Sequence, residues 1–216
     1  MTTLFLAFLC AILLHLSAIA AMAHVAGVGI RTFSFGAGPR LVAVGRFRIG
    51  AVPLGGYVRF VDSREGPVAA DELRSAFDHQ PAATQLGIIL SGCLALVVAA
   101  VAVEGDAVLR AFAVAPLQFL GGAVSPLGKA QVLLADVSRF SRDASWTTLF
   151  GVAAAKLAAI NLLPFPALNG GAAVGVVARV AGWARHWPAE LTQVQLFGFL
   201  AALTSWCVAI AVFAMA

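Results

Sequence analysis

The stretch Asn161-Leu162-Leu163-Pro164-Phe165-Pro166-Ala167-Leu168-Asn169-Gly170-Gly171 decides how the rest of the sequence is interpreted. It closes an apolar segment that begins near Trp146. Each proline removes a backbone donor and clashes with the preceding turn, and glycine permits a positive φ and a close backbone approach. A helix should therefore break here at membrane depth. Because irregular backbone inside a bilayer is tolerated only where protein covers it or where it lines a cavity, we expect the break to border a site.

The composition is that of an integral membrane protein. Of the 216 residues, 61% are hydrophobic and only 11% are charged, whereas a soluble domain is about half apolar and a quarter charged. The lipid bilayer is therefore an expected partner. The net charge is +4. In a chain that spans a membrane, the positions of the arginines between the spans are more informative than this total. Nucleic acid is not an expected partner.

Four apolar runs predict four membrane spans, because a helix needs roughly 20 residues to cross a bilayer. The predicted spans are about 4–26, 86–103, 146–163 and 191–216, within a single integral membrane domain over 1–216. We expect the first run to be retained as a helix, since no lysine or arginine precedes it as in a signal peptide. Residues 104–145 are predicted to form an external loop.

Residues 27–81 differ from the spans. They carry seven arginines against five acidic residues, with frequent glycine and β-forming residues, which predicts short strands joined by glycine turns. A lone hairpin is marginal in water, so it should pack on the helices or on the membrane surface. Arginine-rich short loops mark the cytoplasmic side. Arg179 and Arg185, in the corner after the third span, agree with that orientation.

The opening stretch resembles the N-x-x-P-x-P-x-L-D-G-G signature of the site-2 protease family, the zinc intramembrane metalloproteases. Residues 27–39 and 49–60 are similar to further segments of that family, and the likeness covers nearly the whole chain. The resemblance implies an all-α membrane protein, a four-span helical bundle of site-2 protease type with a small membrane-associated β-hairpin region. It also implies a place in the bacterial inner (plasma) membrane.

The family's metal site is degenerate in this sequence. The family binds zinc through His-Glu-x-x-His on its first helix and through the aspartate of the signature. The matching residues are 15–19, where His15 is kept, Leu16 stands at the general base and Ile19 at the second histidine, while Asn169 replaces the aspartate. A catalytic zinc needs about three protein ligands, and its water needs a base. We therefore expect no catalytic or metal-binding residue here, only a vestigial site of these four.

The resemblance leaves three functions open. The first is a catalytically inactive homologue, a pseudoprotease that binds or regulates a membrane protein or transmembrane helix and needs no cofactor. The second is an active intramembrane zinc metalloprotease, a metalloendopeptidase with an atypical site. The third is a structural subunit of a membrane complex.

A cleft for an extended peptide, bound by strand addition, is expected beside the break. Lys156, in the middle of the third predicted span, allows two interpretations. Its stem could carry the ammonium to an interface, or the ammonium could face the vacated site and bond Asn169 or His15. The candidate cleft residues are Gly55, Gly56, Tyr57, Lys156, Asn161, Pro164 and Pro166.

Overall fold

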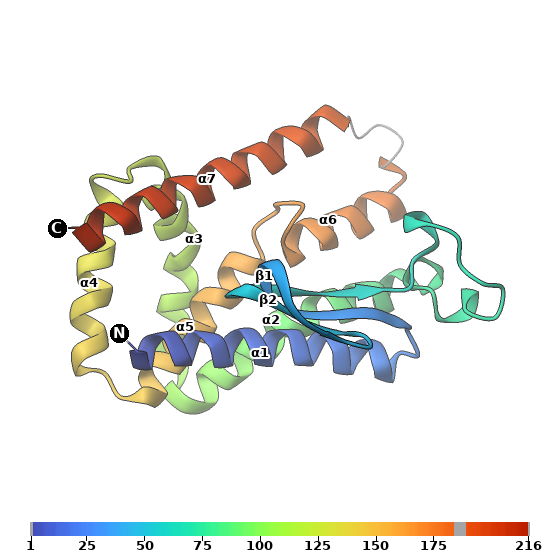
Figure 1. The fold of residues 1–216 in the computed structure, drawn as a ribbon, viewed down its shortest axis with the longest axis horizontal. Helices are drawn as coiled ribbons and strands as arrows, with labels where there is room; N and C mark the ends of the chain where they lie inside the picture. The colour runs from blue at the N-terminus through green and yellow to red at the C-terminus, as the bar shows by residue number, and fades with distance from the viewer. Residues whose placement is uncertain (1, 184–188, 216) are drawn as a thin grey trace.

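The computed structural model of the protein describes residues 2–183 and 189–215, and Figure 1 shows their arrangement. Helices dominate, and both marked chain ends lie at the same end of the view. The helices and strands are α1 (Thr2–Val25), β1 (Ile30–Val44), β2 (Phe47–Phe60), α2 (Ala82–Glu104), α3 (Leu109–Val124), α4 (Lys129–Asp143), α5 (Trp146–Asn161), α6 (Asn169–Val180) and α7 (Ala189–Met215). The predicted corner at Arg185 lies outside the described residues.

Four helical segments in the described part of the chain are long and apolar enough to cross a membrane: Thr2–Val25, Ala82–Glu104, Asp106–Val124 and Thr192–Met215. Three of them are the predicted first, second and fourth spans. The predicted third span is α5, whose 16 residues extend only about 24 Å at 1.5 Å per residue. That length is short of the roughly 30 Å of a hydrocarbon core.

The prediction of a loop over 104–145 is wrong, because α3 and α4 occupy most of it. Pro116 and the glycine pair Gly121-Gly122 suggested a loop, yet all three lie inside α3. Membrane helices tolerate such residues because neighbouring groups satisfy the freed backbone. Ser125 to Gly128 forms the turn into α4, where Ser125 accepts a hydrogen bond from the Lys129 backbone at 3.1 Å.

Helix α5 is the centre of the bundle. It packs on α1, α2 and α3 through buried small residues. Small side chains allow helix axes to approach closely and gain dispersion contacts where lipid offers no hydrophobic driving force. The core around α5 includes Leu96, Ala100, Ala154, Ala155 and Ala158. The short length of α5 is thus compatible with burial, since other helices surround it.

The two strands form one sheet in which the chain turns back more than once, so that residues 33–37 run parallel to 47–52 and antiparallel to 56–60. Residues Phe33 to Phe35 pair with 47–49 on one side and with 56–58 on the other. The sheet therefore has four segments, in the order 40–44, 47–52, 30–37 and 56–60. The strand prediction is confirmed for this region, but it is wrong for residues 61–81, which contain three short 3-10 turns (Ser63–Glu65, Leu73–Ser75 and Phe77–His79).

The second half of helix α7 is hydrogen-bonded to α3 and α4. The indole Nε1 of Trp206 donates to the Phe119 carbonyl at 3.0 Å, and Gln131 donates to the Ala209 carbonyl at 3.0 Å. Nearer its start, the ring of Phe199 lies 5.3 Å from that of Phe165.

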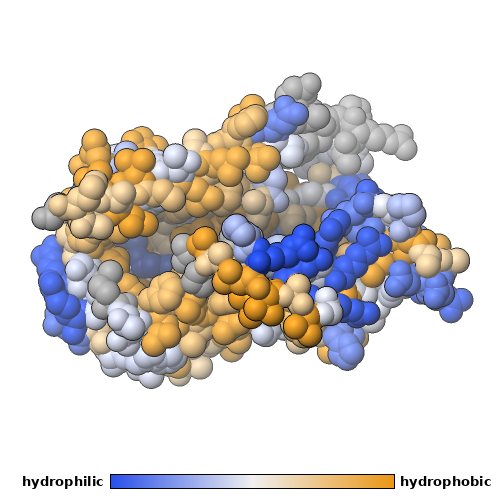
Figure 2. Space-filling model, viewed as in Figure 1, coloured by the Kyte–Doolittle hydropathy of each residue, from blue (hydrophilic) through white to orange (hydrophobic). Residues whose placement is uncertain are grey.

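Figure 2 shows apolar residues over α7 and the body of the molecule, with hydrophilic residues gathered at α4 and at the opposite end. Such a distribution is expected of a membrane protein.

Candidate functional site

A cavity of about 250 Å³ lies where α1, the sheet, α2 and the break after α5 meet. It brings together most of the residues that the sequence singled out, although they are as much as 154 positions apart. All four vestigial positions line it, as do five of the seven candidate cleft residues. These nine residues are His15, Leu16, Ile19, Gly55, Gly56, Tyr57, Asn161, Pro166 and Asn169.

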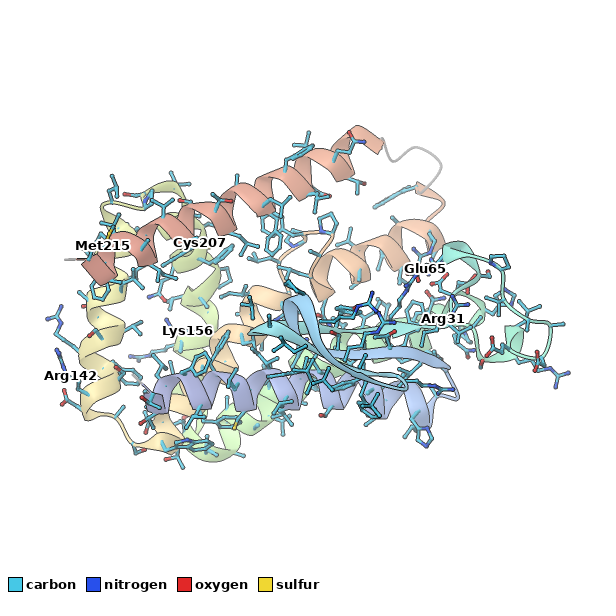
Figure 3. All side chains as sticks on the ribbon, in the orientation of Figure 1. Arg31, Glu65, Arg142, Lys156, Cys207 and Met215 are labelled. Carbon is cyan, nitrogen blue, oxygen red and sulfur yellow. The ribbon has the colours of Figure 1, made fainter. Side chains whose placement is uncertain are left out.

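Lys156 and Pro164 are not among the lining residues. The Lys156 ammonium donates a hydrogen bond to the side-chain oxygen of Gln118 on α3. Lys156 is half-buried, and Figure 3 shows it labelled between α1 and α3. It therefore bonds α3 rather than His15 or Asn169. Gln118 was missed because the sequence around it was assigned to a loop.

The predicted break is present between Asn161, the last residue of α5, and Asn169, the first residue of α6. Its backbone is bonded locally: Leu163 donates to Ile160 at 3.0 Å, Phe165 to Leu163 at 2.8 Å and Leu168 to Phe165 at 2.9 Å. These bonds satisfy donors that would otherwise be costly at membrane depth. Residues 166–169 line the cavity, so the break borders a cavity.

The two glycines of the signature serve one of the two expected purposes, the close approach of backbone, and not the other, a positive φ. Gly170 and Gly171 do not adopt a positive φ but lie in the first turn of α6. A Cβ atom at Gly170 would overlap the Leu162 carbonyl, and one at Gly171 would overlap the Phe165 carbonyl. Glycine is needed here because the helix start lies directly on the backbone of the break.

Asn169 connects three elements across the cavity. Its Oδ1 lies 3.3 Å from Nε2 of His15 on α1, and its Nδ2 donates to the Ile89 carbonyl on α2. His15 itself is only 6% exposed. The amide therefore joins α6 to both α1 and α2 at the position of the family's third metal ligand.

These residues do not fit a zinc ion. Leu16 and Ile19 are buried apolar side chains that offer no ligand, which leaves one imidazole and one amide already bonded to each other. Within residues 2–183 and 189–215, no group of three histidine, cysteine, aspartate or glutamate side chains is close enough to share a metal. Structural and catalytic zinc sites both require at least three protein ligands.

The sheet closes the cavity from one side. Segment 56–60 is the edge of the sheet next to α1, and Gly55 to Val58 and Phe60 all line the cavity. A Cβ atom at Gly56 would lie 2.5 Å from Cδ1 of Leu16, so the sheet reaches α1 only because this residue is glycine. On the side that faces away from residues 33–35, segment 56–60 has no neighbouring strand among the described residues.

Comparison with known proteins agrees with this arrangement. The family model described as Peptidase family M50 matches residues 3–205. The chain belongs to peptidase family M50, the site-2 protease family. A protein of Neisseria meningitidis serogroup A named "Putative zinc metalloprotease" is 36% identical over 109 residues, which are 49% of this chain and 24% of that protein. A Xylella fastidiosa protein with the same name is 38% identical over 74 residues, which are 32% of this chain and 17% of that protein.

The matched regions thus cover about a quarter or less of these relatives' own lengths. Membership in family M50 confirms the resemblance seen in the sequence. Together with the apolar helices, it shows a membrane protein.

Proposed function

We propose that this M50 chain is a catalytically inactive member that binds a membrane segment of a partner protein in the cavity beside Asn169. The observation that carries the proposal is the hydrogen-bonded contact between His15 and Asn169. The two polar residues left from the family's metal site bond each other across the cavity, and the two other positions of that site are buried leucine and isoleucine. The chemistry is lost while the cavity is kept.

The free sheet edge supports binding of an extended segment. Segment 56–60 presents unpaired backbone groups along the cavity, and an unpaired edge is a template for strand addition. The bound segment would lie between this edge and the break, with Tyr57 and Asn161 on its two sides. We further propose that the chain lies in the bacterial inner membrane, with the arginine-rich β segment on the cytoplasmic side.

The names of the relatives favour a second candidate, an active zinc metalloprotease with an atypical site. Elemental analysis of the purified chain separates the two. We expect less than stoichiometric zinc, and no chelator-sensitive cleavage of a single-span reporter. Tightly held zinc in a one-to-one ratio, with cleavage abolished by chelator, would support the second candidate instead.

A photoreactive amino acid at Tyr57 tests binding directly. We expect cross-links from position 57 to a single-span partner, and none from a matched position at Leu94, which is 64% exposed on α2 and is not among the cavity-lining residues. Equal cross-linking from both positions would mean that the cavity has no special role. A chain that cross-links from neither position but co-purifies with other membrane proteins would instead fit a structural subunit.

A further inference from the structure

Lys156 is a cation inside the helical bundle. It is the only charged residue of α5, and its neighbours Ala155 and Leu157 pack in the same apolar cluster as Ala11 of α1. Ala11 lies nine residues, or about 14 Å, inside the start of that candidate membrane span. Lys156 therefore projects from within the apolar layer, where charged side chains are rare, paired and functional.

The fold gives this ammonium an uncharged partner. Lys156 donates to the side-chain oxygen of Gln118 on α3, but an ammonium has three donors and no acceptor. In the part of the chain that the structure describes, Lys156 forms no ion pair. Helices α1, α3, α5 and α6 contain no acidic residue, and Glu104 of α2 lies against Gly151, five residues earlier in α5. The positive charge of Lys156 is thus left uncompensated.

The side of α5 that carries Lys156 is only partly covered. Val152, Lys156 and Ile160 follow one another at four-residue spacing, so they lie on one side of the helix. All three are half-buried, whereas Ala154 and Ala158, on the other side, are fully buried. The bundle therefore packs on one side of α5 and leaves the Lys156 side partly accessible.

A hollow adjoins this part of the bundle. Figure 2 shows it between the row of residues over α7 and the rest of the molecule, and Figure 3 places Lys156 between α1 and α3 in the same view. Helix α7 packs on α3 and α4, and only 6% of its apolar span is buried. This arrangement leaves space beside α5 for a further helix.

We propose that Lys156 is the docking point for a transmembrane helix of a partner protein that carries an aspartate or a glutamate. The partner's carboxylate accepts the donors of Lys156 that Gln118 does not take, and the partner helix packs along Val152, Lys156 and Ile160. Charge complementarity selects this occupant, because hydrocarbon chains offer the ammonium no acceptor and lipid phosphates lie outside the hydrocarbon core. The site is separate from the cavity beside Asn169, which Lys156 does not line.

Synthetic transmembrane peptides test this pairing. The full chain, labelled with a fluorescent donor, is reconstituted in phosphatidylcholine vesicles with acceptor-labelled leucine-alanine peptides that span the bilayer. The peptides differ only in their central residue, which is aspartate, asparagine or leucine. Energy transfer should show that the aspartate peptide binds roughly tenfold more tightly than the leucine peptide, as for other polar contacts between membrane helices. It should also bind more tightly than the asparagine peptide, which carries no charge.

Substitutions at position 156 separate charge from structure. Lys156→Met should abolish the preference for aspartate, Lys156→Arg should keep it, and Lys156→Glu should transfer it to a peptide with a central lysine. Lys129→Met is the matched control, because Lys129 is exposed at the start of α4, and it should change nothing. Thermal unfolding checks the fold of each variant, and the comparison of peptides on the wild type needs no variant.

Equal binding of the aspartate and asparagine peptides to the wild type would overturn the proposal, as would persistence of the preference in Lys156→Met or its loss in Lys129→Met. Loss of the preference on addition of phosphatidylglycerol would assign the ammonium to lipid phosphate and would overturn it too. Tyr57→Ala should leave the preference unchanged, because Tyr57 lines the separate cavity. Binding in that cavity and docking at Lys156 can therefore fail independently.

Discussion

The Nε2 atom of His15 on α1 lies 3.3 Å from the Oδ1 atom of Asn169 on α6. Because the Asn169 amide nitrogen donates to the Ile89 carbonyl, its oxygen is the atom left to accept from the imidazole. Nε2 must then carry the proton, and Nδ1, which has no hydrogen-bond partner in the described part of the chain, carries the lone pair. A metal ion binds the lone pair of a ring nitrogen. Here Nε2, the nitrogen next to Asn169, carries the proton and therefore offers no lone pair.

Asn169→Ala should destabilise the bundle. The substitution removes both hydrogen bonds that join α6 to α1 and α2, and it takes from the buried His15 imidazole the partner of its Nε2 atom, which costs about 1–3 kcal/mol. The matched control is Asn161→Ala, because Asn161 also lines the cavity but donates to Leu157 of its own helix at 2.9 Å. Thermal unfolding in mild detergent measures both. An equal loss of thermal stability in the two variants would show that the hydrogen bonds between the helices do not contribute to stability.

Zinc binding should be recoverable only by restoring the whole site. Leu16, Ile19 and Asn169 line one cavity with His15, so Ile19→His and Asn169→Asp would complete three ligands with His15, and Leu16→Glu would supply the base. We expect the triple variant to bind zinc one-to-one by elemental analysis, and Leu16→Glu alone to bind none. If the single variant also takes up zinc, another ligand set exists.

Gly92→Ala should be destabilising despite the higher helix propensity of alanine. A Cβ atom there would lie 2.6 Å from Nδ1 of His15 and 2.8 Å from the His15 carbonyl oxygen. Overpacking of this kind costs about 1–3 kcal/mol. Gly87→Ala on the same helix is the control, since its Cβ would meet only the flexible end of Met22 at 3.5 Å. Comparison of the two melting temperatures in the same detergent measures the difference, and a Gly92→Ala chain as stable as Gly87→Ala would refute the close contact.

Lys156 and Gln118 should be energetically coupled. A double-mutant cycle of Lys156→Met and Gln118→Leu is expected to give an interaction free energy of roughly 1–2 kcal/mol, as for other directly bonded pairs. Gln131→Leu replaces Gln118→Leu in the control cycle, because Gln131 bonds the Pro126 and Ala209 carbonyls. Coupling of the same size in both cycles would mean that Lys156 acts by its charge alone.

The segment after β2 should loosen in acid. The Arg64 side chain, which is hydrogen-bonded to Asp62, holds the pKa of that carboxyl below its ordinary value. A carboxyl whose pKa is lower in the folded state stabilises the fold above its unfolded pKa, and the stabilisation is lost as the pH falls through the folded pKa. The protection factors of amides 61–80, which correct for the slower intrinsic exchange in acid, should therefore fall below about pH 4. Asp62→Asn should weaken that pH dependence, whereas Asp71→Asn, at an exposed position, should preserve it.

The sequence predicted the break and the sheet because each depends on local chemistry. Proline removes a donor wherever it lies, and the spacing of His15, Leu16 and Ile19 on one helix fixes their common face. The likeness to family M50 then placed Asn169 opposite them, and the structure brings the four together.

Two features were beyond the sequence for physical reasons. Pro116 normally ends a helix in water, but α3 contains it, and only the surrounding helices decide whether the freed carbonyl is tolerated. The partner of Lys156 was likewise set by packing: Gln118 becomes available only once α3 is a helix beside α5. Neither fact is encoded in local propensity.

The one-sided attachment of α7 has a kinetic consequence. Three hydrogen bonds join its second half to α3 and α4, at Ser205, Trp206 and Ala209, so a movement of the half near Phe199 away from Phe165 would leave these three bonds in place. Hinge motions of helices take microseconds to milliseconds. Lateral exchange of lipid, or of a partner helix, beside the break would then be timed by this swing and not by dissociation of the whole helix.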